Sequence, residues 1–485
     1  MNQAVVMGFL LLAVAAFVWI RVCAVASTRA PGPRMLGFSL FVTSCGGFLI
    51  VGTAEAAYQS GAIRLASVLP LVALGLGFWL TGPTLAKLAH ESNAKSISEL
   101  LVARFGGARW PFIPLDFALL VVIFAVLAMQ AELLAALINR SVPVSGNVIA
   151  VVLLAVFALP LLRSSSTSTM SAQEWITVLL VMTFAVTAML LLGFSGLPPV
   201  EVKPRTNDLR SVAILGWLVT PAIWRRLASA PQKTRQATTW FLLAAVLCIL
   251  SASVVGGVGV SLFPRSSSPT WEPMPNTLVD PAGTDFSGIL ATVAVEIPPG
   301  STRTSLASFG IMGLIVPVVL LMVVNITANT QALGGLFSRI CGLPERGLHV
   351  GFTFLLVAWL IVAGSSWGSA LSPFLTELGL LTPAMLLNLV PFVLDASWPR
   401  WGHKYGAAAG ILAGSCVVLA LSEPVRQVLT ARKPMLVAAW EPYFDSTAGL
   451  VIALGVNVTV FIAVSLISYA VFGSKSAAVS THPGL

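Results

Sequence analysis

Long apolar stretches are the feature that most constrains this chain. About thirteen of them follow one another, each near the roughly 20 residues that a helix needs to cross a bilayer. Only 9% of the 485 residues are charged and 57% are hydrophobic, so there are too few charged residues to cover the surface of a soluble protein of this size. The sequence predicts an all-α, multi-pass integral protein of the cell (inner or plasma) membrane, in contact with the lipid bilayer. The predicted spans are at about 3–21, 36–58, 65–86, 111–138, 146–162, 175–194, 211–224, 238–262, 306–333, 348–364, 370–394, 405–421 and 447–472.

Basic residues indicate how the spans are oriented. When the loops are assigned to alternate sides, one set holds more Lys and Arg close to the helix ends, as in the segment from Arg225 to Arg235. We therefore expect the amino terminus outside and the carboxyl terminus in the cytoplasm. The net charge of +9 reflects this asymmetry, so nucleic acid is not expected as a partner. The oligomeric state stays open.

Residues for catalysis do not form any familiar pattern. The histidines form no HExxH motif, the cysteines form no CxxC pair, and a GxSxG sequence is absent. The longest polar segment, residues 264–305, is rich in Pro, Ser, Thr and Gly, and we interpret it as an external loop. We expect neither an enzyme nor a bound cofactor, apart from a sodium ion as a coupling ion.

The second span contains polar and small residues that a plain transmembrane helix does not need. Gly46 and Gly47 follow Thr43, Ser44 and Cys45. One interpretation is close helix packing at small residues. The other, which we favour, is an unwound helix whose freed carbonyls bind a cation beside a solute site. Further along the same span lies Glu55, an ionisable residue within the membrane.

A second polar run lies in the span at 306–333. Asn325 and Asn329 are one helical turn apart, with Thr327 and Thr330 beside them. Oxygen ligands of this kind suit a hard cation, whereas the alternative is hydrogen bonding between helices. Glu132, two residues after Gln130, is interpreted mainly as an interfacial residue or as a partner of a neighbouring helix.

Four segments resemble the sodium:solute symporter family. The second span from Gly46 to Gly61 resembles the first core helix of that family. The segment from Ser96 to Gly106 is similar to its T-x-x-D-x-x-x-x-R-F-G loop, and Pro221 to Ala230 to its P-x-x-x-x-R-x-x-A loop. Tyr405 to Gly414 resembles its late G-A-x-x-G-x-x-x-G segment. The resemblance extends over roughly residues 36–420.

This resemblance implies the LeuT-type fold, in which two inverted repeats of five helices enclose a midplane site built from discontinuous helices. Residues 1–34 would form an extra amino-terminal helix and residues 35–195 the first repeat, with a discontinuous first core helix. Residues 196–395 would form the second repeat, including the external loop 264–305. Residues 396–485 would add extra carboxyl-terminal helices.

The resemblance also implies a function and its residues. The expected function is cation-coupled symport, driven by sodium or protons, of a small polar or organic solute through alternating access. The alternative is a membrane sensor or interaction module that does not transport. Carried over, the sodium-like site would comprise Val42, Cys45, Val323, Asn325 and Thr327, with Ile326 where the family has a hydroxyl ligand. Glu55, where the family usually has a small residue, offers a proton-coupling alternative. The solute would contact Ser44, Cys45, Gly46, Gly47, Phe48, Gln130, Trp217 and Thr220.

Overall fold

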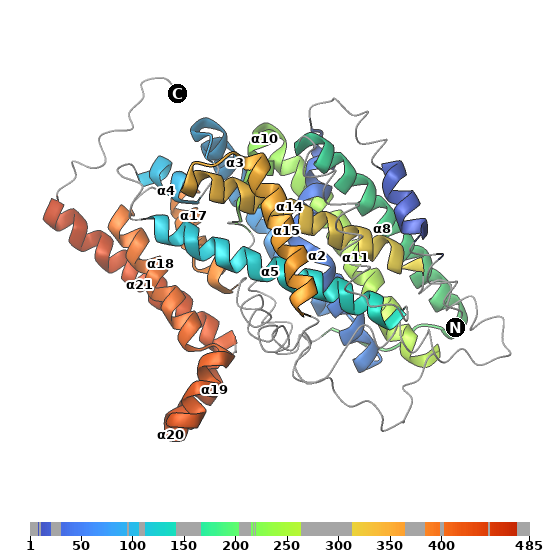
Figure 1. The fold of residues 1–485 in the computed structure, drawn as a ribbon. Coiled ribbons are helices and arrows are strands. Elements are labelled where there is room, and N and C mark those ends of the chain that lie inside the picture. Colours follow the sequence, from blue (N-terminus) through green and yellow to red (C-terminus); the bar gives the residue numbers. More distant parts are fainter. Residues whose placement is uncertain are drawn as a thin grey trace.

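The structure, a computed structural model, is all-helical apart from one short strand pair (Figure 1). It describes residues 8, 11–20, 31–94, 97–105, 112–141, 166–202, 215–216, 218, 220–262, 313–363, 384–397, 402–444 and 447–472. The helices are α2 (Pro33–Ser60), α3 (Leu69–Ser92), α4 (Ile97–Phe105), α5 (Ile113–Ser141), α8 (Ser166–Ser195), α10 (Pro221–Ser229), α11 (Thr234–Leu262), α14 (Ile315–Cys341), α15 (Glu345–Ala363), α17 (Val390–Ser397), α18 (Lys404–Ala420), α19 (Glu423–Arg432), α20 (Pro434–Trp440) and α21 (Thr447–Phe472).

Several helices are long and apolar enough to cross a membrane. Within the described residues there are five of them, and a bent pair, Pro33–Gly46 and Leu49–Tyr58, makes a sixth. Each of these helices overlaps a predicted span. The predicted span 146–162 and the loop 264–305 lie outside the described residues. The short helices α19 and α20 occupy a segment for which no helix was predicted.

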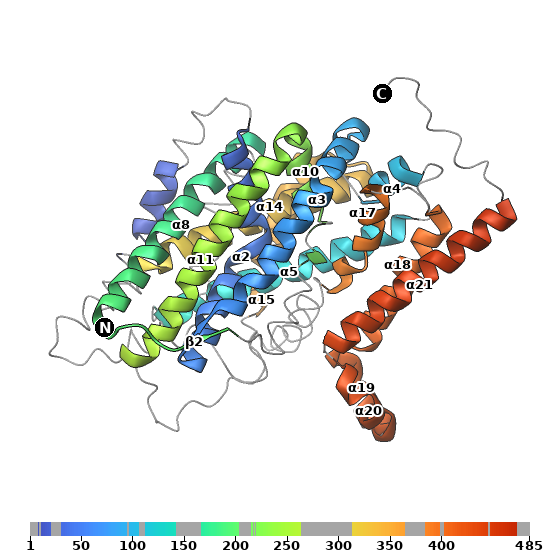
Figure 2. The ribbon, with the colours of Figure 1, turned by 180° about the vertical axis from the view of Figure 1, so that it is seen from behind.

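Helices α3, α8 and α11 lie side by side, and α2 packs along α11 (Figures 1 and 2). Glycines let α2 and α11 approach closely at both ends of their contact. A Cβ added at Gly37 would lie 2.3 Å from the Ala237 carbonyl oxygen, and one at Gly256 would lie 1.9 Å from the Ala54 carbonyl oxygen. Small residues at such crossings increase van der Waals contact, which drives helix association in a bilayer.

Helix α14 is the centre of the fold. It contacts α2, α5, α8, α10 and α15, and nearly all of its apolar residues are buried. A helix that is buried on all sides has no face in contact with solvent, so solvent does not explain its polar residues. Its buried Asn and Thr residues therefore need protein partners or a ligand, because unpaired polar groups in such a place are costly.

Helices α18 and α21 pack together at one edge of the molecule (Figures 1 and 2). Gly406, Gly410 and Gly414 form a stripe on α18, and a Cβ on any of them would lie 3.0 Å or less from atoms of Asn457, Phe461 or Ser465 on α21 or of Asn388. The glycine pattern that resembles the late family segment thus provides close helix packing here.

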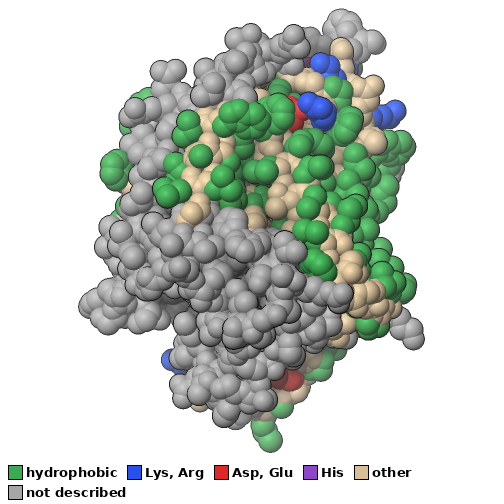
Figure 3. Space-filling model, turned by 90° about the vertical axis from the view of Figure 1, so that its right-hand side faces the viewer, with side chains coloured by type: hydrophobic (Ala, Val, Ile, Leu, Met, Phe, Trp, Pro, Cys, Tyr) green, Lys and Arg blue, Asp and Glu red, His purple; other side chains and the backbone are tan. Residues whose placement is uncertain are grey.

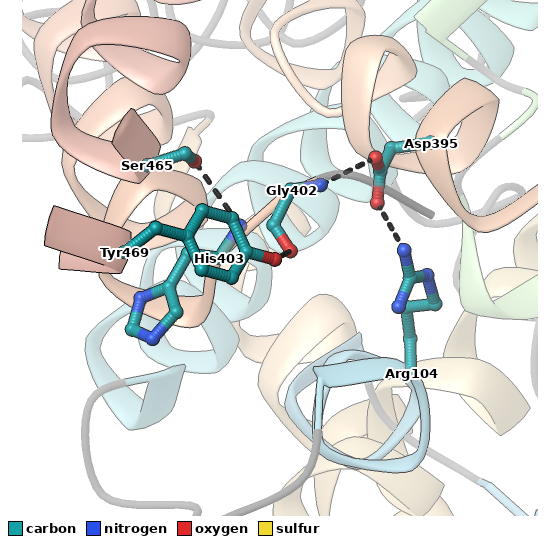
Figure 4. Close-up of polar contacts among 6 residues, drawn as sticks. All are labelled: Arg104, Asp395, Gly402, His403, Ser465 and Tyr469. Atoms are coloured by element: carbon teal, nitrogen blue, oxygen red, sulfur yellow. Dashed lines mark hydrogen bonds and ion pairs between the residues drawn. The ribbon is translucent and has the colours of Figure 1, made fainter. Parts of the chain in front are cut away.

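A buried polar cluster joins this edge to the rest of the fold (Figure 4). Arg104 of α4 donates to Asp395 of α17 at 2.7 Å, and the other Asp395 oxygen accepts from the Gly402 N–H at 2.9 Å. Tyr469 of α21 donates to the Gly402 carbonyl at 3.2 Å. Burial, with a smaller effect of the adjacent Lys404 charge, lowers the pKa of His403, which favours the neutral ring. Its Nδ1 then accepts from the Tyr405 N–H.

The surface agrees with a membrane location. Among the side chains coloured in Figure 3, hydrophobic ones are the most frequent, and Lys and Arg gather near the upper right. Large apolar residues on α3 and α8 are exposed, among them Leu76, Leu80, Met182 and Met189. A soluble monomer rarely exposes so many neighbouring apolar residues, whereas lipid-facing helices do. The strand pair β1 (Ile63–Arg64) and β2 (Val200–Glu201) is parallel and connects the ends of α2 and α8.

Candidate functional site

The candidate site is built around a break in α2. Gly46 has φ 48° and ψ 166°, outside helical geometry, and the segments on either side are bent by 68°. A residue with a side chain rarely adopts this conformation, so the glycine permits the break. The discontinuous first core helix expected from the Gly46-Gly47 pair is therefore present. A break of this kind leaves backbone carbonyls available to partners outside the helix.

Asn325 of α14 takes up two of these carbonyls. Its side-chain Nδ2 donates to the Val42 oxygen at 2.5 Å and to the Thr43 oxygen at 3.2 Å. Both carbonyls belong to the last turn before the break. The side chain of Asn325 is buried, as are Val42 and Thr43. This amide therefore links the central helix directly to the broken helix.

The rest of the polar run supports Asn325 or bonds within its own helix. Asn329 Nδ2 donates to Asn325 Oδ1 at 2.7 Å and to the Asn325 backbone oxygen at 3.1 Å. Thr327 and Thr330 each donate to a carbonyl one turn earlier, at Val323 and Ile326, both at 2.8 Å. Such bonds satisfy a hydroxyl without any contact outside the helix.

Gln130 of α5 faces the break from another side. A Cβ at Gly46 would lie 3.2 Å from Gln130 Nε2 and 3.7 Å from Asn325 Nδ2, so the two amides flank the glycine. Gln130 is buried, and its Oε1 has no hydrogen-bond partner among the described residues. A buried amide oxygen without a partner costs free energy unless a ligand or water supplies a donor. Helices α2, α5 and α14 thus bring three predicted site residues together.

The other predicted solute residues are only partly described. Ser44 and Cys45 are buried just before the break, and the Ser44 hydroxyl donates to the Leu40 carbonyl at 2.8 Å. Thr220 is buried and extended, with φ −69° and ψ 137°, directly before α10, which Pro221 begins. Trp217 lies outside the described residues. The side chains of Phe48 and Glu55 also lie outside the described part of the chain, and Gly47 directly follows Gly46 at the break.

Polar contacts hold the amino-terminal half of α2 to its neighbours. Ser39 donates to Gln173 of α8 at 2.5 Å and accepts from Arg226 Nε of α10 at 2.6 Å. Arg34 at the start of α2 pairs with Glu174 of α8. The sequence offered no direct sign of this network, since its members are far apart along the chain and belong to three helices.

Asn325 and Thr327, two of the residues expected to ligate sodium, form hydrogen bonds to protein carbonyls in the arrangement found. The Val42 oxygen already accepts a hydrogen bond from Asn325, and the Asn325 side chain points its nitrogen, not its oxygen, toward α2. Ile326, which the resemblance placed where the symporter family has a hydroxyl ligand, is buried, and Thr327 donates to a carbonyl within α14. Hard cations need converging oxygen ligands, and an N–H donor cannot be one.

Glu132 bonds a neighbouring helix, one of the roles considered for it from the sequence. Its carboxylate accepts a hydrogen bond from the indole Nε1 of Trp359 on α15 at 2.8 Å. The contact joins α5 to α15. It accounts for a carboxylate inside an apolar helix, because such groups in membranes usually have a specific partner.

Comparisons with known proteins agree on the fold. No family model matches the sequence, and no curated protein matches it. A substrate-bound, outward-open Na⁺-coupled sialic acid symporter has a similar structure, with a TM-score of 0.64 over 96% of this chain and 97% of that one, at 13% identity. A manganese transporter of Eremococcus coleocola aligns with a TM-score of 0.52 over 90% and 94% of the two chains, at 15% identity. The chain is thus an all-α, multi-pass membrane protein of the LeuT type, as predicted.

Proposed function

We propose that this protein is a cation-coupled secondary transporter that carries a small polar solute by alternating access around the break in α2. The observation that carries the proposal is the break at Gly46, flanked by the Gln130 and Asn325 amides within a LeuT-type fold. We further propose that it belongs to the sodium:solute symporter family by its fold, whichever cation drives it, with repeats at residues 35–195 and 196–395 and with the amino terminus outside. The similar solved structures are transporters, and we propose transport and not catalysis for this protein.

The chemistry of the break favours a neutral solute that carries a hydrogen-bond donor. Gln130 and Asn325, the side chains closest to Gly46, are uncharged amides. The Gln130 oxygen lacks a partner among the described residues, so a solute N–H or O–H would satisfy it. A carboxylate or phosphate would instead require cationic groups or many donors. We include Ser44, Cys45, Phe48, Trp217 and Thr220 in the proposed solute site.

A flux assay separates transport from the alternative of a sensor on the same fold. Purified protein would first be screened by thermal shift against sugars, polyols and nucleobases, with amino acids as carboxylate-bearing comparisons, because a ligand of the folded state raises its melting temperature. A stabilising compound, radiolabelled, would then be offered to proteoliposomes under an imposed sodium or proton gradient. Accumulation against its own gradient is the expected result. Binding without flux would favour a sensor.

Removing the Gln130 oxygen should weaken solute binding. In Gln130→Met the solute donor loses its partner, and an unpaired buried donor costs about 1–3 kcal/mol. We therefore expect the solute's dissociation constant to rise about 5- to 150-fold, measured by titration of the thermal shift. Gln236→Met, the same change at an exposed position on α11, is the control. Unchanged affinity in Gln130→Met would remove Gln130 from the solute site.

We propose Glu55 as the proton-coupling residue. Its replacement by Gln keeps the shape of the side chain and removes its ability to bind and release a proton. We expect Glu55→Gln to reduce accumulation driven by a pH gradient while leaving counterflow of the solute intact. Glu91→Gln, on the exposed end of α3, is the matched control. Accumulation that stays pH-driven in Glu55→Gln would make Glu55 a structural residue.

A further inference from the structure

We propose that the side-chain amide of Asn325 replaces a cation at the break in α2, so that sodium has no binding position between α2 and α14. The inference rests on the proposed function, because it concerns how that transport is coupled. Its basis is the pair of hydrogen bonds from Asn325 Nδ2 to the Val42 and Thr43 carbonyls. A cation bound to the same two oxygens would have to occupy the space that this nitrogen fills.

The direction of the Asn325 amide follows from backbone groups at both ends of the network. An amide nitrogen and oxygen differ only in their hydrogen-bonding roles, so the partners decide which is which. Val42 and Thr43 contribute carbonyls, which only accept, and therefore require the NH₂ group of Asn325. The backbone carbonyl of Asn325 likewise requires the NH₂ group of Asn329. That group also reaches Asn325 Oδ1, at 2.7 Å.

Each polar atom of the Asn325 side chain is thereby used. The two amide hydrogens point to two carbonyls, and the amide oxygen accepts from Asn329. The dipole presents its positive end to the carbonyls, as a cation would, without placing a net charge in the membrane interior. Turning the amide over would face oxygen to oxygen at α2 and disrupt the bond with Asn329. Asn329 thus acts as a positioning residue for Asn325.

Asn325 is distinguished from the neighbouring polar residues by the helix that it reaches. Thr327 and Thr330 bond to carbonyls of α14 itself, whereas the Asn325 amide bonds to α2. Hydrogen bonds within α14 would be enough to satisfy the polar residues of that helix. The hydrogen bonds from Asn325 to the α2 carbonyls instead determine what else these carbonyls can bind.

Replacing the amide nitrogen by oxygen tests the inference. Asn325→Asp is nearly isosteric, keeps the acceptor for Asn329, and puts an oxygen where the donor was. Melting temperatures of purified protein would be measured without solute, at mildly alkaline pH, in sodium chloride and in equal potassium chloride. We expect no sodium-selective shift in the wild-type protein. In Asn325→Asp we expect a saturable, sodium-selective rise of at least about 2 °C.

Two further variants keep the test decisive. Asn388→Asp is the matched control, because Asn388 is also buried and accepts from the Asn457 amide, but it lies near α18 and α21. It should gain no sodium response. If Asn325→Asp does not yield monodisperse protein, Asn325→Ser removes the amide nitrogen and leaves a hydroxyl oxygen that can ligate a cation, so it should gain the response instead. A sodium-selective shift in the wild type, or none in either Asn325 variant, would overturn the inference.

The readout is independent of transport. Because the assay contains neither solute nor gradient, it reports on the break even if the protein carries nothing. Absence of flux in proteoliposomes would overturn the proposed function and leave the sodium result standing. A sodium response of the wild type would overturn the Asn325 inference and leave symport standing.

Discussion

Gly46→Leu is expected to abolish solute accumulation in proteoliposomes. Gly46 has φ 48° and ψ 166°, close to a backbone region that essentially only glycine populates, so a side chain there costs about 1–3 kcal/mol. Its Cβ would also lie 3.2 Å from Gln130 Nε2. Leucine strongly favours a continuous helix, which would close the break and withdraw the carbonyls from Asn325. We expect uptake to fall at least about 100-fold, as misplacement of about 1 Å at a reacting site can cause.

The control for this prediction lies on the same helix. Gly52 has helical geometry, is exposed, and a Cβ on it would meet no atom within 4 Å. Gly52→Leu should therefore retain uptake, and it is compared directly with Gly46→Leu for expression and for elution as a single species. The double variant with leucine at both Gly46 and Gly47 should behave like Gly46→Leu. Undiminished uptake by Gly46→Leu would show that transport does not need the break.

The break could be predicted because its cause is local. Adjacent glycines within an apolar span reduce the cost of leaving the helix, and the structure departs from helical geometry at Gly46. Spacing along α14 placed Asn325 and Asn329 on one face of that helix, and the resemblance to the symporter family placed that face opposite the break. The fold class followed from the apolar spans and from segments resembling one family.

The use of the polar residues could not be predicted from the sequence. An asparagine side chain carries both a donor and an acceptor, so its letter does not say whether it ligates a cation or replaces one. At Asn325 the answer depends on Asn329 and on two backbone carbonyls of α2. Gln130 was a candidate from the sequence, but its unpartnered oxygen is a property of the packing around it.

Contacts between distant segments were also beyond the sequence. Arg104 lies in the segment that resembles the family's R-F-G loop, yet nothing in that segment indicates Asp395 as its partner, 291 residues away. The pair lies between α4 and α17, beside the Gly402 turn that leads into α18 (Figure 4). Long-range pairing of this kind arises from helix packing and not from local propensity.

Breaking the Arg104–Asp395 pair is expected to destabilise the protein strongly. The side chains are only 10% and 2% exposed, and their atoms are 2.7 Å apart. Removing one partner leaves a buried charge uncompensated, which typically costs about 3–5 kcal/mol. Asp395→Asn retains an oxygen for the Gly402 N–H but removes the charge, so its effect isolates the ion pair. The measurement is the melting temperature of purified protein. Arg104→Met, which removes the other charge of the pair, is measured in the same way.

The double variant distinguishes an ion pair from two independent structural residues. If the pair acts as a unit, Arg104→Met combined with Asp395→Asn removes both charges and should recover most of the stability lost in either single variant. Additive losses would mean that the two side chains stabilise the fold separately. Glu91→Gln, which breaks the exposed contact of Lys87 with Glu91 on α3, should change stability by less than about 1 kcal/mol. The contrast between the two pairs follows from burial, since an exposed charge that loses its partner is resolvated by water and a buried one is not.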